Sequence, residues 1–498
     1  MKSSTFVYEE TPLIELLVLS SFIYLLNAFG SGLEKLLHAG LIAQIGVGIV
    51  YGPPLGNILP QNWLGSLQAL GNLGLILLVF QGMRCSVTTP FSTSLTVYAG
   101  GLSTKLDLLK ANIVLSITVA LVGILVPIGL SLICFVYAFG DTPLQGFTAG
   151  AALCSTSLGT TFAILSSLQT SVNLRSTRIG VVLLSAAIID DVVGLIMASV
   201  VATVTAPDVH VHGKRLAWII LQPVIASGGM AGVTSIIGKW LLLPAYRKLI
   251  SRLGPRIGRE VLLVMLIAVL SGMVAISNYT GSSMLFGAYS AGCLLQFLDT
   301  TSAELSIFSF EDTFEVRIRQ YNDHIFVPFF FSSIGLAIPF TSLWKGSILW
   351  KGAVYSLLMW LGKATTGICI LLWPEPADQS IKPENNEALR VMGRPGAEEP
   401  GQANHAGRRD SERPPGKEKA RLKGKKDWPL YPALLLSLAM VSRGEIALLI
   451  AQLGVPTLGE EDFLVVMWAT VLCTLIGAVT TGQLVHRRFN ECTRNNWG

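Results

Sequence analysis

The chain has 498 residues, of which 51% are hydrophobic and only 13% are charged. A water-soluble domain carries about 25% charged residues, so this composition excludes a soluble protein and places most of the chain in lipid. The formal net charge of +5 does not indicate a nucleic-acid partner, because the basic residues lie between hydrophobic segments, where they orient a membrane protein.

Apolar segments long enough to cross a bilayer, about 17 to 25 residues each, recur along nearly the whole chain. They predict an all-α polytopic membrane protein with about thirteen transmembrane helices, the first of which is retained and not cleaved as a signal peptide. The expected helices cover residues 13–31, 36–52, 64–81, 111–138, 146–168, 178–203, 216–243, 260–277, 281–298, 322–339, 350–373, 430–453 and 462–485.

Basic residues follow the odd-numbered helices of this series, as Lys105 and Lys110 follow the third. Because such residues gather on the cytoplasmic side, the N-terminus is expected outside and the C-terminus inside. Residues 374–428 are rich in Pro, Gly and charged residues and predict a disordered cytoplasmic loop after the eleventh helix. The Ser/Thr-rich segment 82–99 separates two stretches that would join smoothly without it, so we treat it as a candidate insertion.

A polar patch with a glycine interrupts the apolar fifth helix at residues 154–161. Backbone at membrane depth unwinds only where it lines a cavity or is buried in protein. Thr156 and Ser157 are therefore candidates to bind a hard monovalent cation, which prefers oxygen ligands. The alternative is ordinary hydrogen bonding of these side chains within a continuous helix.

Two adjacent aspartates, Asp190 and Asp191, lie near the middle of the sixth helix, where an ionisable group costs about 2.5–3.5 kcal/mol even on lenient scales. Neighbours on a helix point about 100° apart, so the two are expected to face different partners. Lys363, at the midpoint of the eleventh helix, is the obvious partner for one of them. The other carboxylate stays unbalanced, and Asp191 is the candidate metal ligand for a transported Na⁺ or K⁺ with which a proton competes. The alternative is a fixed ion-pair network for helix packing.

A second interruption, at residues 441–445, splits the apolar twelfth helix. We assign Arg443 and Glu445 a structural role there, in which they neutralise each other or the ends of the broken helix. The fifth and twelfth helices run in opposite directions, and broken helices at corresponding places in two oppositely oriented halves indicate an inverted-repeat transporter. Helices four to six are then expected to mirror helices eleven to thirteen.

Seven short motifs, in this order along the chain, resemble the sodium/proton exchangers of the cation/proton antiporter-2 family. They are residues 45–53, 156–159, 190–191, 286–292, 328–335, 362–363 and 443–445. The resemblance implies a sodium/proton antiporter fold of inverted repeats with two crossed discontinuous helices, in which a mobile core bundle moves against a scaffold in an elevator-like manner. It further implies that Asp191 carries the cation and the proton, and that Asp190 pairs with Lys363 in the cation-free state.

The same resemblance implies a division of the chain into scaffold and core. Residues 1–110 are then N-terminal scaffold helices with the candidate insertion 82–99, 111–203 the first half of the core bundle, and 204–345 scaffold and dimerisation helices. Residues 346–373 form a core helix, 374–428 the cytoplasmic loop, and 429–498 the second half of the core with a short tail.

The expected function is secondary active antiport of a monovalent cation and protons by alternating access, in a multi-pass membrane protein of the plasma membrane or an endomembrane. The expected partners are the cation, protons, membrane lipid and a second copy of the chain in a homodimer; no cofactor, enzyme activity or nucleic acid is expected. A cation channel and a potassium/proton exchanger are alternatives. An intramembrane aspartyl protease is a remote one, because its aspartates face each other from separate helices.

Overall fold

The computed structural model describes residues 12–37, 39–86, 103–157, 177–205, 214–253, 258–301, 308–373 and 429–492, whose regular structure is entirely helical. The first part contains α1 (Leu13–Leu37), α2 (Gly40–Tyr51), α3 (Gln61–Ser86), α5 (Ser103–Ile133), η1 (Cys134–Phe139), α6 (Pro143–Ala152), α8 (Arg178–Val204), α9 (Lys214–Ile237), η3 (Gly238–Leu242), α10 (Leu243–Leu253), α11 (Arg259–Thr280) and α12 (Met284–Thr301). It is followed by α13 (Phe310–Phe314), η4 (Glu315–Arg319), η5 (Asn322–Phe326), α14 (Val327–Ala337), α15 (Phe340–Leu343), α16 (Gly346–Ala364), α17 (Thr366–Leu372), α18 (Leu430–Val441), α19 (Glu445–Leu453) and α20 (Val455–Cys492).

Within the described residues, eight helices are long and apolar enough to span a membrane, and the bent pair α18 and α19 raises the number to nine. The expected all-helical class is confirmed, whereas the count of thirteen stays a prediction. The shorter apolar helix α2 does not by itself reach the length of a span. The loop expected at 374–428 lies outside the described residues, as does most of segment 82–99, whose first residues extend α3 as far as Ser86.

One group of helices packs around α14 and α12: α2 and α3 contact α14, α3 and α11 contact α12, and α1 contacts α2. The backbones of α2 and α14 approach closely because each carries a glycine at the crossing. A Cβ at Gly48 would collide with the backbone of Ser332, and one at Gly335 would collide with the carbonyl of Ile45. Small residues at a crossing allow this kind of close packing between helices in lipid.

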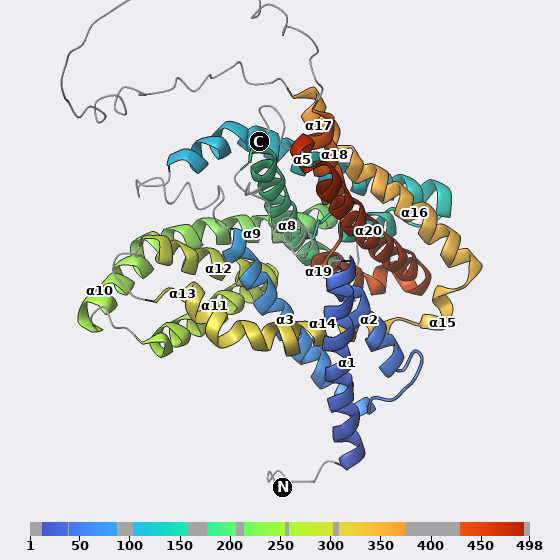
Figure 1. Cartoon of the computed structure of the whole chain (residues 1–498), viewed down its shortest axis with the longest axis horizontal. Helices are drawn as coiled ribbons and strands as arrows, with labels where there is room; N and C mark the ends of the chain where they lie inside the picture. Colours follow the sequence, from blue (N-terminus) through green and yellow to red (C-terminus); the bar gives the residue numbers. More distant parts are fainter. Residues whose placement is uncertain are drawn as a thin grey trace, which may run out of the picture.

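The second group contains the two candidate repeats. In the first, α5 packs on α6 and α8; in the second, α16 and α18 pack on α20. The repeats interlock, because α6 contacts α20 while α18 and α19 contact α8. Figure 1 shows α16, α17, α18 and α20 gathered on one side of the molecule, whereas α10, α11, α12 and α13 lie on the other.

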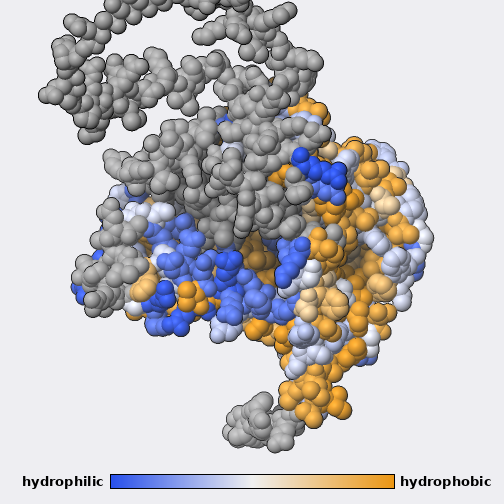
Figure 2. All heavy atoms as spheres, in the orientation of Figure 1, coloured by the Kyte–Doolittle hydropathy of each residue, from blue (hydrophilic) through white to orange (hydrophobic). Residues whose placement is uncertain are grey.

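Large apolar side chains remain exposed on the outer faces of many helices, as expected for surfaces that face lipid tails. On α1 these include Leu13, Ile14, Leu17, Tyr24 and Leu36. Figure 2 shows hydrophobic surface along the C-terminal side of the molecule and down the protruding N-terminal helix. The protein is thus an integral membrane protein with several spans.

Candidate functional site

The first side of the site is a fully buried ion pair between α8 and α16. Lys363 Nζ pairs with Asp190 Oδ2, and neither side chain has any exposed surface. Thr156 completes the cluster: its hydroxyl accepts a hydrogen bond from Lys363 Nζ at 3.0 Å and donates one to Asp190 Oδ2 at 2.5 Å. Lys363 lies in the last turn of α16, where the helix dipole favours a positive charge.

The second side of the site is Asp191, which is 7% exposed and whose Oδ1 atom accepts no hydrogen bond from any described residue. The charges that act most strongly on it are those of Glu445, Asp190 and Lys363, in that order. Because the charge of Lys363 is already matched by Asp190, the negative charge of Asp191 is left uncompensated. The structure therefore brings Asp190, Asp191 and Lys363 together, and Asp190 is the aspartate that pairs with Lys363.

Two non-helical segments meet beside these carboxylates. α6 begins at a capping box, in which Thr142 Oγ1 accepts from Gln145 N while Gln145 Oε1 accepts from Thr142 N, and it ends at Ala152. The chain is then non-helical up to Ser157, and residues 158–176, which include the remainder of the break expected at 154–161, lie outside the described residues. The second break separates α18 from α19, which are bent by 42° to each other.

The two breaks cross in direct contact. Ser157 N donates a hydrogen bond to the carbonyl of Ser442 at 2.9 Å. A Cβ at Gly444 would lie only 2.7 Å from Ser157 Oγ, so a glycine is needed for this approach. α20 also packs closely against the break between α18 and α19. The close approach occurs at Gly477, where a Cβ would lie 2.7 Å from Ser442 N.

Arg443 joins the two breaks through its side chain, which has no exposed surface. Its Nη1 atom donates to the carbonyl of Ser155 at 2.8 Å and is 3.4 Å from that of Cys154. These carbonyls follow the C-terminus of α6, where a helix leaves acceptors unsatisfied. Among the described residues, no hydrogen bond joins Arg443 to Glu445, and the structural role expected for these two residues at their own break stays a prediction.

Of the hydroxyls expected at the site, that of Thr156 is engaged by Asp190 and Lys363. A third hydroxyl, that of Ser155, lies against α8 one turn beyond the two aspartates. A Cβ at Gly194, one turn after Asp191 on α8, would lie 3.0 Å from Ser155 Cβ and 3.8 Å from its Oγ. This Oγ is buried and has no hydrogen-bond partner among the described residues. From the sequence, Ser155 could be identified only as a member of the polar patch at residues 154–161.

Sequence reasoning did not place two further residues near Asp191. Glu445, in the first turn of α19, was expected to have only a structural role, and its charge acts on Asp191. Tyr289, on α12, belongs to the motif at residues 286–292 and also lies within range of the charge of Asp191. The adjacent aspartates in the sequence could not indicate that either residue lies near Asp191, because this proximity depends on how α12 and α19 pack against α8.

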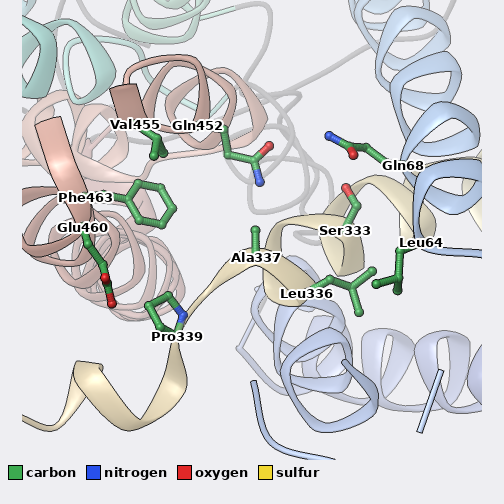
Figure 3. A pocket seen from close by; sticks show the side chains of 10 residues that line it. All are labelled: Leu64, Gln68, Ser333, Leu336, Ala337, Pro339, Gln452, Val455, Glu460 and Phe463. Carbon is green, nitrogen blue, oxygen red and sulfur yellow. The ribbon is translucent and has the colours of Figure 1, made fainter. Parts of the chain in front are cut away.

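A cavity of about 660 Å³ lies between the two groups of helices. Figure 3 shows Gln68 and Ser333 on one side of it and Gln452, Glu460 and Phe463 on the other. It is lined in full by Leu64, Gln68, Ser333, Leu336, Ala337, Pro339, Gln452, Val455, Glu460 and Phe463. Gln452 follows Glu445 by seven residues, so both lie on one face of α19, about 10 Å apart along its axis. Leu449, between them, is also partly exposed, so this face of α19 leads from the cavity towards Asp191.

Comparison with known proteins adds three findings. Residues 18–487 match the family model described as sodium/hydrogen exchanger, transmembrane. The chain is 29% identical over 217 residues to the high-affinity Na⁺/H⁺ antiporter NhaS3 of Synechocystis, a match that spans 44% of this chain and only 42% of that protein. It is 26% identical over 322 residues to the Na⁺/H⁺-K⁺ antiporter GerN of Bacillus cereus, covering 64% of this chain and 69% of GerN.

The fold is similar to that of a solved antiporter. The sodium proton antiporter MjNhaP1 from Methanocaldococcus jannaschii, in its structure at pH 8, superimposes with a TM-score of 0.56 over 95% of this chain and 99% of its own. At 15% sequence identity, this likeness concerns the fold and not the transported ion.

Proposed function

The chain belongs to the sodium/hydrogen exchanger family, and from that premise we propose that it exchanges a monovalent cation, Na⁺ or K⁺, for protons by alternating access. The observation that carries this proposal is the uncompensated carboxylate of Asp191 beside a matched Asp190–Lys363 pair. An uncompensated carboxylate in a nearly dry site must be neutralised, either by a proton or by a cation. Because the two cannot bind together, each turnover exchanges one for the other.

The groups around Asp191 suit a hard alkali cation, which takes oxygen ligands. Asp191 supplies a carboxylate, Ser155 a buried hydroxyl that packs against α8 one turn further on, and Glu445 a second negative charge. Asp190 and Lys363 neutralise each other in the cation-free state, so Asp191 alone carries the exchangeable charge. Thr156 supports that pair, and we assign it no direct contact with the cation.

Alternating access requires that the site meets the two sides of the membrane in turn. We assign the movement to the core group of helices, which carries Asp191, and the fixed frame to the helices around α12 and α14. The cavity is lined by α3 and α14 on one side and by α19 and α20 on the other. It supports this division, because it lies at the boundary of the two groups of helices. A homodimer through the scaffold and the absence of enzyme activity are part of the same proposal.

A potassium/proton exchanger is the second candidate, because the printed name of one relative, GerN, includes K⁺. The aspartyl protease has less support, since Asp190 is held by Lys363 and not by Asp191. A channel has less support because Arg443 and the hydrogen bond between Ser157 and Ser442 close the backbone around the site.

The experiment is proton flux in proteoliposomes driven by an imposed gradient of Na⁺ or of K⁺. Wild-type protein is expected to move protons in response to at least one of the two cations, with an apparent KM for the cation that rises as the pH falls. Asp191→Asn should abolish this flux in folded protein. The matched control is Asp323→Asn, which changes the same residue type where its side chain is 37% exposed. Undiminished exchange in Asp191→Asn would exclude Asp191 as the carrier, and currents that are not coupled to protons would favour the channel.

A further inference from the structure

The helix formed by α9, η3 and α10 changes character along its length. Most of the described exposed side chains of α9 are apolar, including Ile225, Val233 and Ile236, and Gln222 is a polar exception. At the end of this apolar face, Trp240 is 77% exposed and Leu241 is also exposed. Tryptophan is enriched at the boundary between hydrocarbon and water, so the lipid-facing part of this helix ends near Trp240.

After the exposed Pro244 and Ala245, the exposed residues in the described part of α10 are basic. Arg247, Lys248 and Arg252 are all exposed, and the sequence of α10 contains neither Asp nor Glu. At 1.5 Å per residue, Arg247 lies about 9 Å beyond Leu241. An arginine at this distance from the apolar face lies in the zone of the lipid head groups, which its long side chain can reach.

Packing keeps the basic side of α10 turned outwards. Tyr246 is only 2% exposed, and its ring centroid lies 5.4 Å from that of Phe310 on α13. This contact holds the apolar side of α10 against the protein. Arg247 Nη2 is 3.5 Å from the carbonyl of Thr301, a long contact that leaves most of its donors unused.

Neighbouring arginines have interaction partners within the protein. Arg259 lies 4.5 Å above the ring of Phe308, and Arg317 pairs with Glu260. Among the described residues, no ion pair links Arg247 or Arg252 to a carboxylate. These two side chains therefore present positive charge to the surroundings at the depth of lipid phosphates.

We propose that the basic face of α10, which carries Arg247 and Arg252, binds the phosphate groups of anionic phospholipid. Charge complementarity favours an anion, and the guanidinium fork matches the geometry of a phosphate oxygen pair. Continuity with the lipid-facing side chains of α9 favours a phospholipid over a soluble anion, because the acyl chains of the same molecule pack on Val233, Ile236 and Leu241. This surface lies outside the cation site and is independent of the function proposed above.

The test is thermal unfolding and lipid binding of the full chain in detergent, with phosphatidylglycerol as the probe and phosphatidylcholine as its neutral counterpart. Phosphatidylglycerol is expected to raise the unfolding midpoint and phosphatidylcholine to leave it unchanged. Arg247→Gln with Arg252→Gln should lower the affinity for phosphatidylglycerol roughly 30-fold, since each basic residue near a lipid surface contributes about 1 kcal/mol, a factor of roughly five. Exchange activity in phosphatidylcholine vesicles should be retained.

Matched controls separate this site from general charge effects. Lys345→Gln removes an exposed positive charge at the start of α16 and should change phosphatidylglycerol binding far less than Arg252→Gln alone. Equal stabilisation of wild-type protein by phosphatidylcholine, or by inorganic phosphate without lipid, would overturn the proposal whether or not the double variant folds. Unchanged phosphatidylglycerol affinity in the double variant would also overturn it.

Discussion

At the scale of single residues, the buried pair of Asp190 and Lys363 is the most constrained feature of the site. Each member is held by the other and by Thr156, and none of the three has more than marginal exposure. Space for the ammonium group comes from α5, where a Cβ at Gly123 would lie 3.3 Å from Lys363 Nζ. A charge in such a place is stable only while its partner is present.

We therefore expect Lys363→Met to lower the free energy of unfolding by about 3–5 kcal/mol, because it leaves Asp190 buried without a counter-charge. The double variant Lys363→Met with Asp190→Leu should recover much of this loss, since it removes both charges. Thermal unfolding in detergent measures both effects, with the exposed Lys345→Met as a control. A double variant no more stable than Lys363→Met would contradict this account.

Glu445 provides a second prediction at this scale. Glu445→Gln removes the negative charge that acts most strongly on Asp191, and both a cation and a proton are attracted less without it. The apparent KM for the cation is expected to rise by roughly threefold or more, and the pH profile of exchange should shift to lower pH, while maximal exchange persists. Glu461→Gln, on the exposed first part of α20, is the control. A role confined to helix packing would move neither quantity.

The sequence indicated part of this residue-scale arrangement. Two aspartates and one lysine at mid-membrane predicted a contact, because a buried charge needs a partner. The choice of Asp190 for Lys363 came from the resemblance, not from the residues themselves. The positions of Ser155, Glu445 and Tyr289 around Asp191 could not be predicted, since they depend on the crossing of α6, α19 and α12 with α8. The roles of these residues in transport stay predictions.

At the scale of elements, the helices meet through glycines at a few crossings. The α2–α14 contact is the clearest example, because Gly46 and Gly48 of α2 lie in different environments. A Cβ at Gly48 would collide with the backbone of Ser332, whereas a Cβ at Gly46 would meet nothing within 4 Å. The two positions therefore form a matched pair within one helix.

We expect Gly48→Ala to destabilise the protein by about 1–3 kcal/mol, the usual effect of overpacking a close contact. Gly46→Ala should be neutral or slightly stabilising, because alanine favours the helix and fills open space. Unfolding midpoints of the two variants in the same detergent test this difference. Equal effects at both positions would show that α2 and α14 are not in backbone contact.

Element boundaries were predictable where polar residues interrupted apolar runs. The break between α18 and α19 falls at Ser442, Arg443 and Gly444, inside the interruption expected at residues 441–445. The continuation of α9 through η3 into α10 was not foreseen, because the basic residues after Trp240 suggested a loop. That these basic residues continue the helix is evident only in the structure, where Tyr246 packs on Phe310.

At the scale of the whole molecule, the all-α class followed from composition and apolar segment length alone. Its division into scaffold and core came from the resemblance, and these boundaries stay a prediction. The cavity between the two groups could not be inferred from the sequence, because its lining comes from three separated parts of the chain. The cavity does offer a direct test of whether the two groups of helices move relative to each other.

A chemical bridge across this cavity should stop transport if the two groups move against each other. We expect Gln68→Cys with Gln452→Cys, joined by a bis-maleimide that spans the cavity, to lose exchange, because the reagent links α3 to α19. The pair Gln452→Cys and Glu460→Cys lies within one group and should remain active after the same treatment. Reagent alone on the parent chain controls for its own cysteines. Full exchange in the bridged first pair would contradict an elevator-like movement.

The crossing of the two breaks has a consequence for the energetics of the transport cycle. The backbone N–H of Ser157 donates to the carbonyl of Ser442, and Arg443 donates to a carbonyl that follows the end of α6. These unwound peptide groups therefore have hydrogen-bond partners that move together with them. When the bundle shifts through the dry centre of the bilayer, these peptide groups do not have to exchange water for protein and back again. The dehydration penalty of each crossing is thereby confined to the ion and the one carboxylate that holds it.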